Sequence, residues 1–65
     1  MTLTVNGESL VTTAVTIPDL LKELGINPDR VAVEVNLSII KKADYSAYTL
    51  KEGDTIEVIN FVGGG

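Results

Sequence analysis

The chain has 65 residues with 5 basic and 9 acidic side chains, a formal net charge of -4, and neither histidine nor cysteine. This length allows one domain and no second one. The composition excludes a disulfide, a zinc–thiolate site, a nucleophilic thiol and a histidine general base. The acidic balance argues against nucleic acid as a partner, because phosphate binding needs clustered lysine and arginine. We therefore expect no catalytic side-chain constellation, no bound cofactor and no metal site.

The first predicted element is a β-hairpin. The first five residues alternate apolar and polar side chains, which is the period of a half-buried strand. Asn6 and Gly7 both tolerate the positive φ that a two-residue type I′ turn requires. Such a turn places Leu3 opposite Leu10, so that two apolar side chains share one face. We expect the second strand to continue through Thr13.

A short helix is predicted next. Thr16 is a suitable N-cap, and Pro18 fits the first turn, where its missing N–H would have no partner. The apolar residues that recur at helical spacing form one stripe: Ile17, Leu20, Leu21 and Leu24. Gly25 favours an end to the helix. A helix of about two turns is stable only when it packs against a sheet.

Three further strands are predicted in the second half of the chain. Residues 31–35 place three valines on one face, and 39–41 form a short strand, whereas 42–48 show no clear period and indicate a loop or a 3₁₀ turn. Gly53 favours a left-handed turn position. The last strand, 55–61, is apolar on both faces, which is typical of a central strand or of one whose outer side meets another surface.

The order strand, strand, helix, strand, short strand, strand predicts an α+β fold. A single helix covers one face of one mixed sheet of four to five strands, and the last strand lies parallel to the first at the centre. This arrangement is the β-grasp; a ferredoxin-like fold is the alternative, although its second helix is missing here. We expect the domain to span 1–62 and a flexible glycine tail to span 63–65.

Two side chains of the last strand are candidate partner-binding residues. Ile59 and Phe61 lie on the face opposite Ile56 and Val58, which the single helix cannot cover. Either the 42–48 loop packs over them, or they form an apolar docking patch together with Val62. A possible cation site is a separate question. Three acidic residues lie near one another in the sequence, but they lack the spacing of a calcium loop: Glu52, Asp54 and Glu57. We expect them in a solvated turn.

The sequence closes with Gly63, Gly64 and Gly65, directly after this apolar strand. A frayed tail is one interpretation. The other is functional, since a glycine segment has no side chains to clash and can extend through a narrow channel into a reaction centre. A carboxylate becomes electrophilic once it is adenylated, and all catalytic groups can then belong to a partner. This chemistry fits a chain without cysteine and histidine.

The chain resembles the ThiS family, the sulfur carrier proteins of thiamin thiazole biosynthesis. The resemblance covers the whole chain, is most specific at the carboxyl end, and rests on these stretches: 5–8 (VNGE), 16–21 (TIPDLL), 50–58 (LKEGDTIEV) and 61–65 (FVGGG). It implies a carrier and not an enzyme. It also implies that an E1-like enzyme adenylates Gly65 with ATP and magnesium, that a sulfur donor protein leads to a thiocarboxylate there, and that thiazole synthase receives the sulfur. Gly64 and Gly65 match the family's functional positions.

Two related functions remain open. The small subunit of molybdopterin synthase shares the fold, the glycine end and the thiocarboxylate chemistry, but tends to carry a proline where this chain has 59–62 without one. A ubiquitin-like modifier that forms isopeptide bonds would use the same tail. The sequence shows no signal peptide and no apolar run long enough to span a bilayer, so we expect a cytoplasmic protein without a membrane partner.

Overall fold

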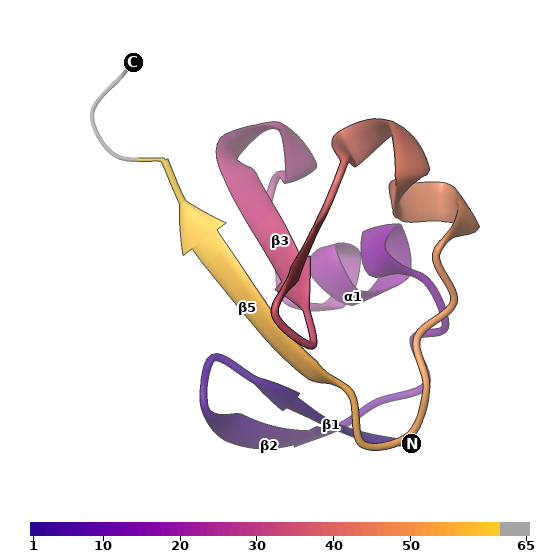
Figure 1. Ribbon diagram of the computed structural model, residues 1–65. Helices are drawn as coiled ribbons and strands as arrows, with labels where there is room; N and C mark the ends of the chain where they lie inside the picture. The colour runs from indigo at the N-terminus through magenta and orange to yellow at the C-terminus, as the bar shows by residue number, and fades with distance from the viewer. Residues whose placement is uncertain (62–65) are drawn as a thin grey trace.

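The computed structural model describes residues 1–61, and these form a five-stranded mixed sheet with one α-helix on one face (Figure 1). The elements follow in chain order: β1 (Thr2–Val5), β2 (Glu8–Val11), α1 (Ile17–Glu23), the 3₁₀ helix η1 (Pro28–Arg30), β3 (Val31–Val35), β4 (Ser38–Ile40), the 3₁₀ helix η2 (Lys42–Ala47) and β5 (Thr55–Asn60). The strand order is β2-β1-β5-β3-β4, with β1 and β5 parallel. The predicted fold, with the last strand at the centre beside the first, is confirmed.

The hairpin of β1 and β2 has the predicted turn and register. Asn6 and Gly7 have φ of 49° and 82°, as a type I′ turn requires. Leu3 lies opposite Leu10 in the antiparallel pairing. Leu3 is buried beneath the sheet, so the hairpin contributes directly to the core.

The predicted extension of the second strand through Thr13 is wrong, because β2 ends at Val11. Thr12 is buried, and its hydroxyl oxygen accepts a hydrogen bond from the Ala14 N–H at 2.9 Å. The same hydroxyl donates to a carboxylate oxygen of Glu23 at 2.5 Å. These bonds turn the chain away from the sheet edge and tie the strand's end to α1.

Helix α1 is built as its sequence predicts. The Thr16 hydroxyl accepts a hydrogen bond from the Asp19 N–H at 3.3 Å, and Gly25 follows the helix with φ of 71°. Three members of the apolar stripe are fully buried: Ile17, Leu20 and Leu21. Leu24 lies at the margin of the core and is 36% exposed. The helix therefore packs on the sheet through its first two turns.

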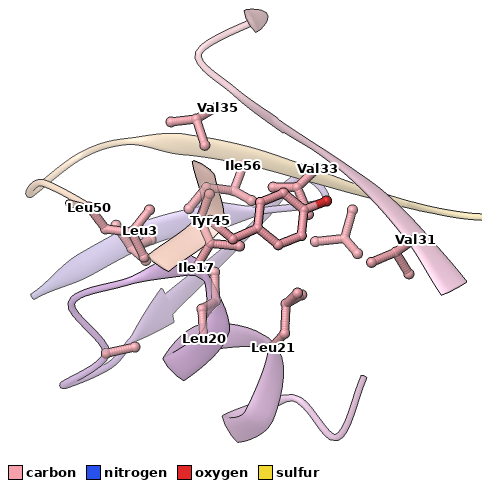
Figure 2. Close-up of a cluster of buried hydrophobic side chains, with 12 residues drawn as sticks. Leu3, Ile17, Leu20, Leu21, Val31, Val33, Val35, Tyr45, Leu50 and Ile56 are labelled. Carbon is pink, nitrogen blue, oxygen red and sulfur yellow. The ribbon is translucent and has the colours of Figure 1, made fainter. Parts of the chain in front are cut away.

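Segment 42–48, which has no clear period in the sequence, forms η2 and packs against α1. Tyr45 is 4% exposed, and its ring lies among the side chains between the sheet and α1 (Figure 2). The other buried apolar residues around it come from every layer of the fold: Leu3, Ala14, Ile17, Leu20, Leu21, Val31, Val33, Val35, Leu50, Ile56 and Val58. The whole core thus lies on the helix side of the sheet.

Two predicted boundaries shift by one residue. The short strand expected at 39–41 is β4 at Ser38–Ile40, and the strand expected at 55–61 is β5, which ends at Asn60. Val62 and the predicted tail 63–65 lie outside the described residues, so the expected division at residue 62 stays a prediction.

Candidate functional site

The candidate site begins with β5, the strand that leads toward the glycines. β5 pairs with β3 along its length, from Val35 opposite Ile56 to Val31 opposite Asn60. The Phe61 N–H then donates to the Arg30 carbonyl at 2.9 Å. The first half of β5 also pairs with β1 (Figure 1). The backbone is therefore held in the sheet by hydrogen bonds as far as Phe61.

Two asparagines in turns fix the register of β5. The Asn6 side-chain oxygen accepts from the Val58 N–H at 2.8 Å, and its own N–H donates to the Ile56 carbonyl at 2.9 Å. The Asn36 side-chain oxygen accepts from the Thr55 N–H at 2.9 Å, and its N–H donates to the Thr55 carbonyl at 2.7 Å. Sequence reasoning missed both side-chain contacts, although an asparagine in each turn was the visible signal.

The prediction of a solvated acidic turn is confirmed for Glu52 and Glu57, which are exposed, and is wrong for Asp54. Asp54 is only 9% exposed. One of its carboxylate oxygens accepts from the Lys51 N–H at 2.9 Å, and the other accepts from the Asn36 side-chain amide at 3.0 Å. Asp54 is thus a structural acceptor that closes the turn. Within residues 1–61, no group of three or more acidic side chains is arranged to hold a metal ion.

Ile59 and Phe61 lie on the sheet face opposite α1. Their side chains are 47% and 67% exposed, while Ile56 and Val58, which alternate with them, are buried. The interpretation that segment 42–48 packs over them is wrong, because η2 lies against α1 on the other face. Two of the three predicted partner-binding residues are therefore accessible; the third, Val62, lies outside the described residues.

The outer sheet face is defined here by the side chains of β3, β4 and β5 that point away from α1, together with Phe61. Its members alternate with the buried residues of these strands: Ala32, Glu34, Ile39, Thr55, Glu57, Ile59 and Phe61. Ile39 is 72% exposed. The face has no catalytic group that could activate a carboxylate. What it offers is a mainly apolar surface beside the strand that leads to the glycines.

The strand order, the parallel central pair and the single covering helix define a β-grasp protein of the ubiquitin-like class. Residues 2–65 match the ThiS family. Sulfur carrier protein ThiS of Bacillus subtilis is 44% identical over 50 residues, covering 77% of this chain and 76% of that protein. The chain therefore belongs to the ThiS family, the sulfur carriers of thiamin biosynthesis.

Comparison with solved structures and with a longer relative agrees with this assignment. The crystal structure of a thiamine biosynthesis protein (ThiS) from Geobacter metallireducens superposes with a TM-score of 0.86 at 33% identity, covering 100% of both chains. A thiazole synthase of Paramagnetospirillum magneticum is 41% identical over 66 residues, which are 100% of this chain. The chain spans only 20% of the length of that relative. No helix in residues 1–61 has the length and apolar character needed to cross a membrane.

Proposed function

We propose that this protein carries sulfur as a thiocarboxylate on Gly65 and delivers it for thiazole formation. The observation that carries the proposal is the ThiS family match over residues 2–65, which includes the three closing glycines. The carboxylate of Gly65 attacks the α-phosphorus of ATP, forms an acyl-adenylate and releases pyrophosphate. Hydrosulfide then attacks the carbonyl carbon and displaces AMP, which leaves with one of the carboxyl oxygens, so that sulfur takes its place. Where the donor presents the sulfur as a persulfide, a thiol cleaves the S–S bond of the resulting acyl disulfide and is itself oxidised to a disulfide.

The partner supplies every catalytic group in this scheme. An E1-like enzyme binds ATP and magnesium and adenylates Gly65, and a sulfur donor protein provides the nucleophile. The composition supports this division, because a chain without cysteine has no thiol of its own on which sulfur could rest. β5 is held in place by its pairing with β3, and the outer sheet face is exposed. Both observations support a protein whose folded domain docks on a partner while its carboxyl end reacts in the partner's active site.

Thiazole synthase is the proposed recipient of the sulfur. The relative from Paramagnetospirillum magneticum that is called a thiazole synthase contains a segment similar to all of this chain. Joining two binding partners in one chain raises their effective concentration, which makes such a linkage useful when the two proteins act together. The ThiS family match favours this recipient over molybdopterin synthase.

Intact-mass measurement tests the proposal. The protein is incubated with the E1-like enzyme of the same organism, ATP, magnesium and a sulfur source. We expect its mass to rise by the difference between sulfur and oxygen, and fragmentation to place the gain on Gly65. Deletion of Gly65 should abolish the gain and leave the melting temperature unchanged. An unchanged mass would refute a sulfur carrier, and adducts linked to lysine would indicate a protein modifier instead.

A further inference from the structure

The turn between β1 and β2 places an asparagine directly before a glycine. Asn6 and Gly7 are both exposed, and a Cβ added to Gly7 would meet no atom within 4 Å apart from its chain neighbours, so water reaches this turn. The Gly7 N–H donates no hydrogen bond to a backbone acceptor within residues 1–61. A glycine nitrogen that follows asparagine can attack the carbon of the side-chain amide, because glycine has no Cβ to hinder the approach.

The turn seen in the structure keeps these two atoms apart. Asn6 is the first central residue of the type I′ turn, a position at which ψ is about +30°. At this ψ the Gly7 nitrogen lies across the Cα–C bond from the Asn6 Cβ, so the two atoms cannot close a ring. In a type II′ turn ψ of the same residue is about −120°, which brings the glycine nitrogen to the side of Cβ. A flip of the Asn6–Gly7 peptide converts one turn into the other.

The flip is compatible with the strands on both sides of the turn. Both turn types join antiparallel strands through a two-residue loop, so the pairing of Val5 with Glu8 is kept. The φ of Asn6 is 49° and stays positive in both types, so its N–H keeps its hydrogen bond to the Ile56 carbonyl. The φ of Gly7, 82°, changes sign, which glycine permits. Asparagine is strained where a type II′ turn prefers glycine, so the flipped turn is a minor state of the folded chain.

The side chain that would react also holds β5. The Asn6 side-chain oxygen accepts from the Val58 N–H at 2.8 Å and thereby continues the parallel pairing of β1 with β5 beyond Val5. This hydrogen bond fixes the side chain in one rotamer, whereas ring closure requires the side chain to rotate toward the Gly7 nitrogen. A chemical change at Asn6 therefore alters a contact between the hairpin and the central strand.

We propose that Asn6 is a site of spontaneous deamidation, which proceeds through the flipped turn while the rest of the domain stays folded. The Gly7 nitrogen bonds to the carbon of the Asn6 side-chain amide, and the amide nitrogen leaves as ammonia together with the Gly7 proton. Water then cleaves either C–N bond of the cyclic imide and leaves aspartate or isoaspartate at this position. Aspartate still offers an oxygen to the Val58 N–H. Isoaspartate adds a methylene to the main chain, which lengthens the turn and removes that acceptor.

Timed incubation of the whole chain in mildly alkaline buffer tests the site. Intact mass and peptide mapping should show the exchange of an amide NH₂ for a hydroxyl at Asn6, with both product peptides present. The other asparagines are internal controls: Asn27 precedes a proline, which has no N–H, and Asn36 and Asn60 precede bulky residues. Each should react at least about tenfold more slowly than Asn6. No exchange at Asn6 while the urea-unfolded chain reacts fully, or equal exchange at Asn36, would overturn the proposal.

A destabilised variant tests the route. Ile17→Val removes one CH₂ group from a fully buried side chain of α1 and should raise the unfolded fraction about fivefold. Deamidation through the flipped turn should proceed at the same rate in this variant and in the unchanged protein, and at least about tenfold more slowly than in urea. A rate about fivefold higher in Ile17→Val would show that the whole domain must unfold first, which would overturn the local route.

Thermal unfolding of the products tests the consequence for β5. The variant Asn6→Asp should melt within about 3 °C of the unchanged protein, because an acceptor remains for the Val58 N–H. The isoaspartate form, separated by chromatography, should melt at least about 5 °C lower, because that N–H loses its partner and the turn no longer fits the register of the hairpin. Equal melting temperatures of the isoaspartate form and Asn6→Asp would show that the contact with β5 does not depend on this residue.

Discussion

Asn36 joins three parts of the fold through one side chain. Its oxygen accepts from the Thr55 N–H, and its amide donates to the buried carboxylate of Asp54. Both bonds span segments about twenty residues apart in the sequence and hold the start of β5 against the β3–β4 turn. Removal of the side chain would leave a strand amide and a largely buried carboxylate without these partners.

We expect Asn36→Gly to lower the free energy of unfolding by about 2 kcal/mol, the cost of unmade hydrogen bonds to a buried carboxylate and a backbone amide. Glycine retains the positive φ of 51° at this position, so backbone strain does not contribute. Urea denaturation measures the change. The matched control is Asn27→Gly, because the Asn27 side chain caps only the exposed η1 and should cost well under about 1 kcal/mol. Equal losses in the two variants would contradict the role assigned to Asn36.

Residue-level prediction succeeded where the cause is local. The positive φ of Asn6 follows from a two-residue turn, and the burial of Leu3 follows from strand alternation. The hydrogen bond from Val58 to the Asn6 side chain could not be predicted in the same way, since it depends on which strand comes to lie beside the hairpin. The pairing of Glu34 with Glu57 could not be predicted from the sequence either, because no turn sets the register between β3 and β5.

At the scale of elements, η2 contributes most of its packing through one side chain. Tyr45 fills the space between α1 and the sheet (Figure 2). Its neighbours in η2 are exposed. The strands and α1 were predictable because their apolar residues repeat with a fixed period. The position of η2 was not, since a segment without a period does not indicate which face of the sheet it covers. One buried tyrosine decides that position.

We expect Tyr45→Ala to lower the free energy of unfolding by about 3 kcal/mol, because truncation removes a buried ring and leaves a cavity. A domain of this size has a total stability of only about 3–10 kcal/mol, so the variant should be partly unfolded at elevated temperature. Tyr45→Phe keeps the ring and should change stability by less than about 1 kcal/mol. Thermal unfolding followed by circular dichroism measures both. Similar melting temperatures for the two variants would show that the ring does not carry the packing of η2.

For the whole molecule, the core and the exposed apolar side chains Ile39, Ile59 and Phe61 lie on opposite faces of one sheet. A chain of 65 residues buries only about 60% of the surface that its unfolded form exposes, so its core is small. Each apolar side chain that is placed on an exposed face is one that the core does not gain. Here β5 contributes to both, with Ile56 and Val58 in the core and Ile59 on the outer sheet face. Strand alternation predicted this separation of roles. The structure adds that no element of residues 1–61 covers the outer face.

This separation predicts that stability and partner binding respond differently to Phe61→Ala. The side chain is 67% exposed, so its truncation should lower the free energy of unfolding by less than about 1 kcal/mol. Aromatic side chains dominate the energetics of interfaces, so the Kd for thiazole synthase should rise at least about tenfold. Val11→Ala is the control, since Val11 is 77% exposed on the edge strand β2 and should change neither quantity appreciably. A large fall in melting temperature with unchanged affinity would assign Phe61 to the fold and remove it from the docking surface.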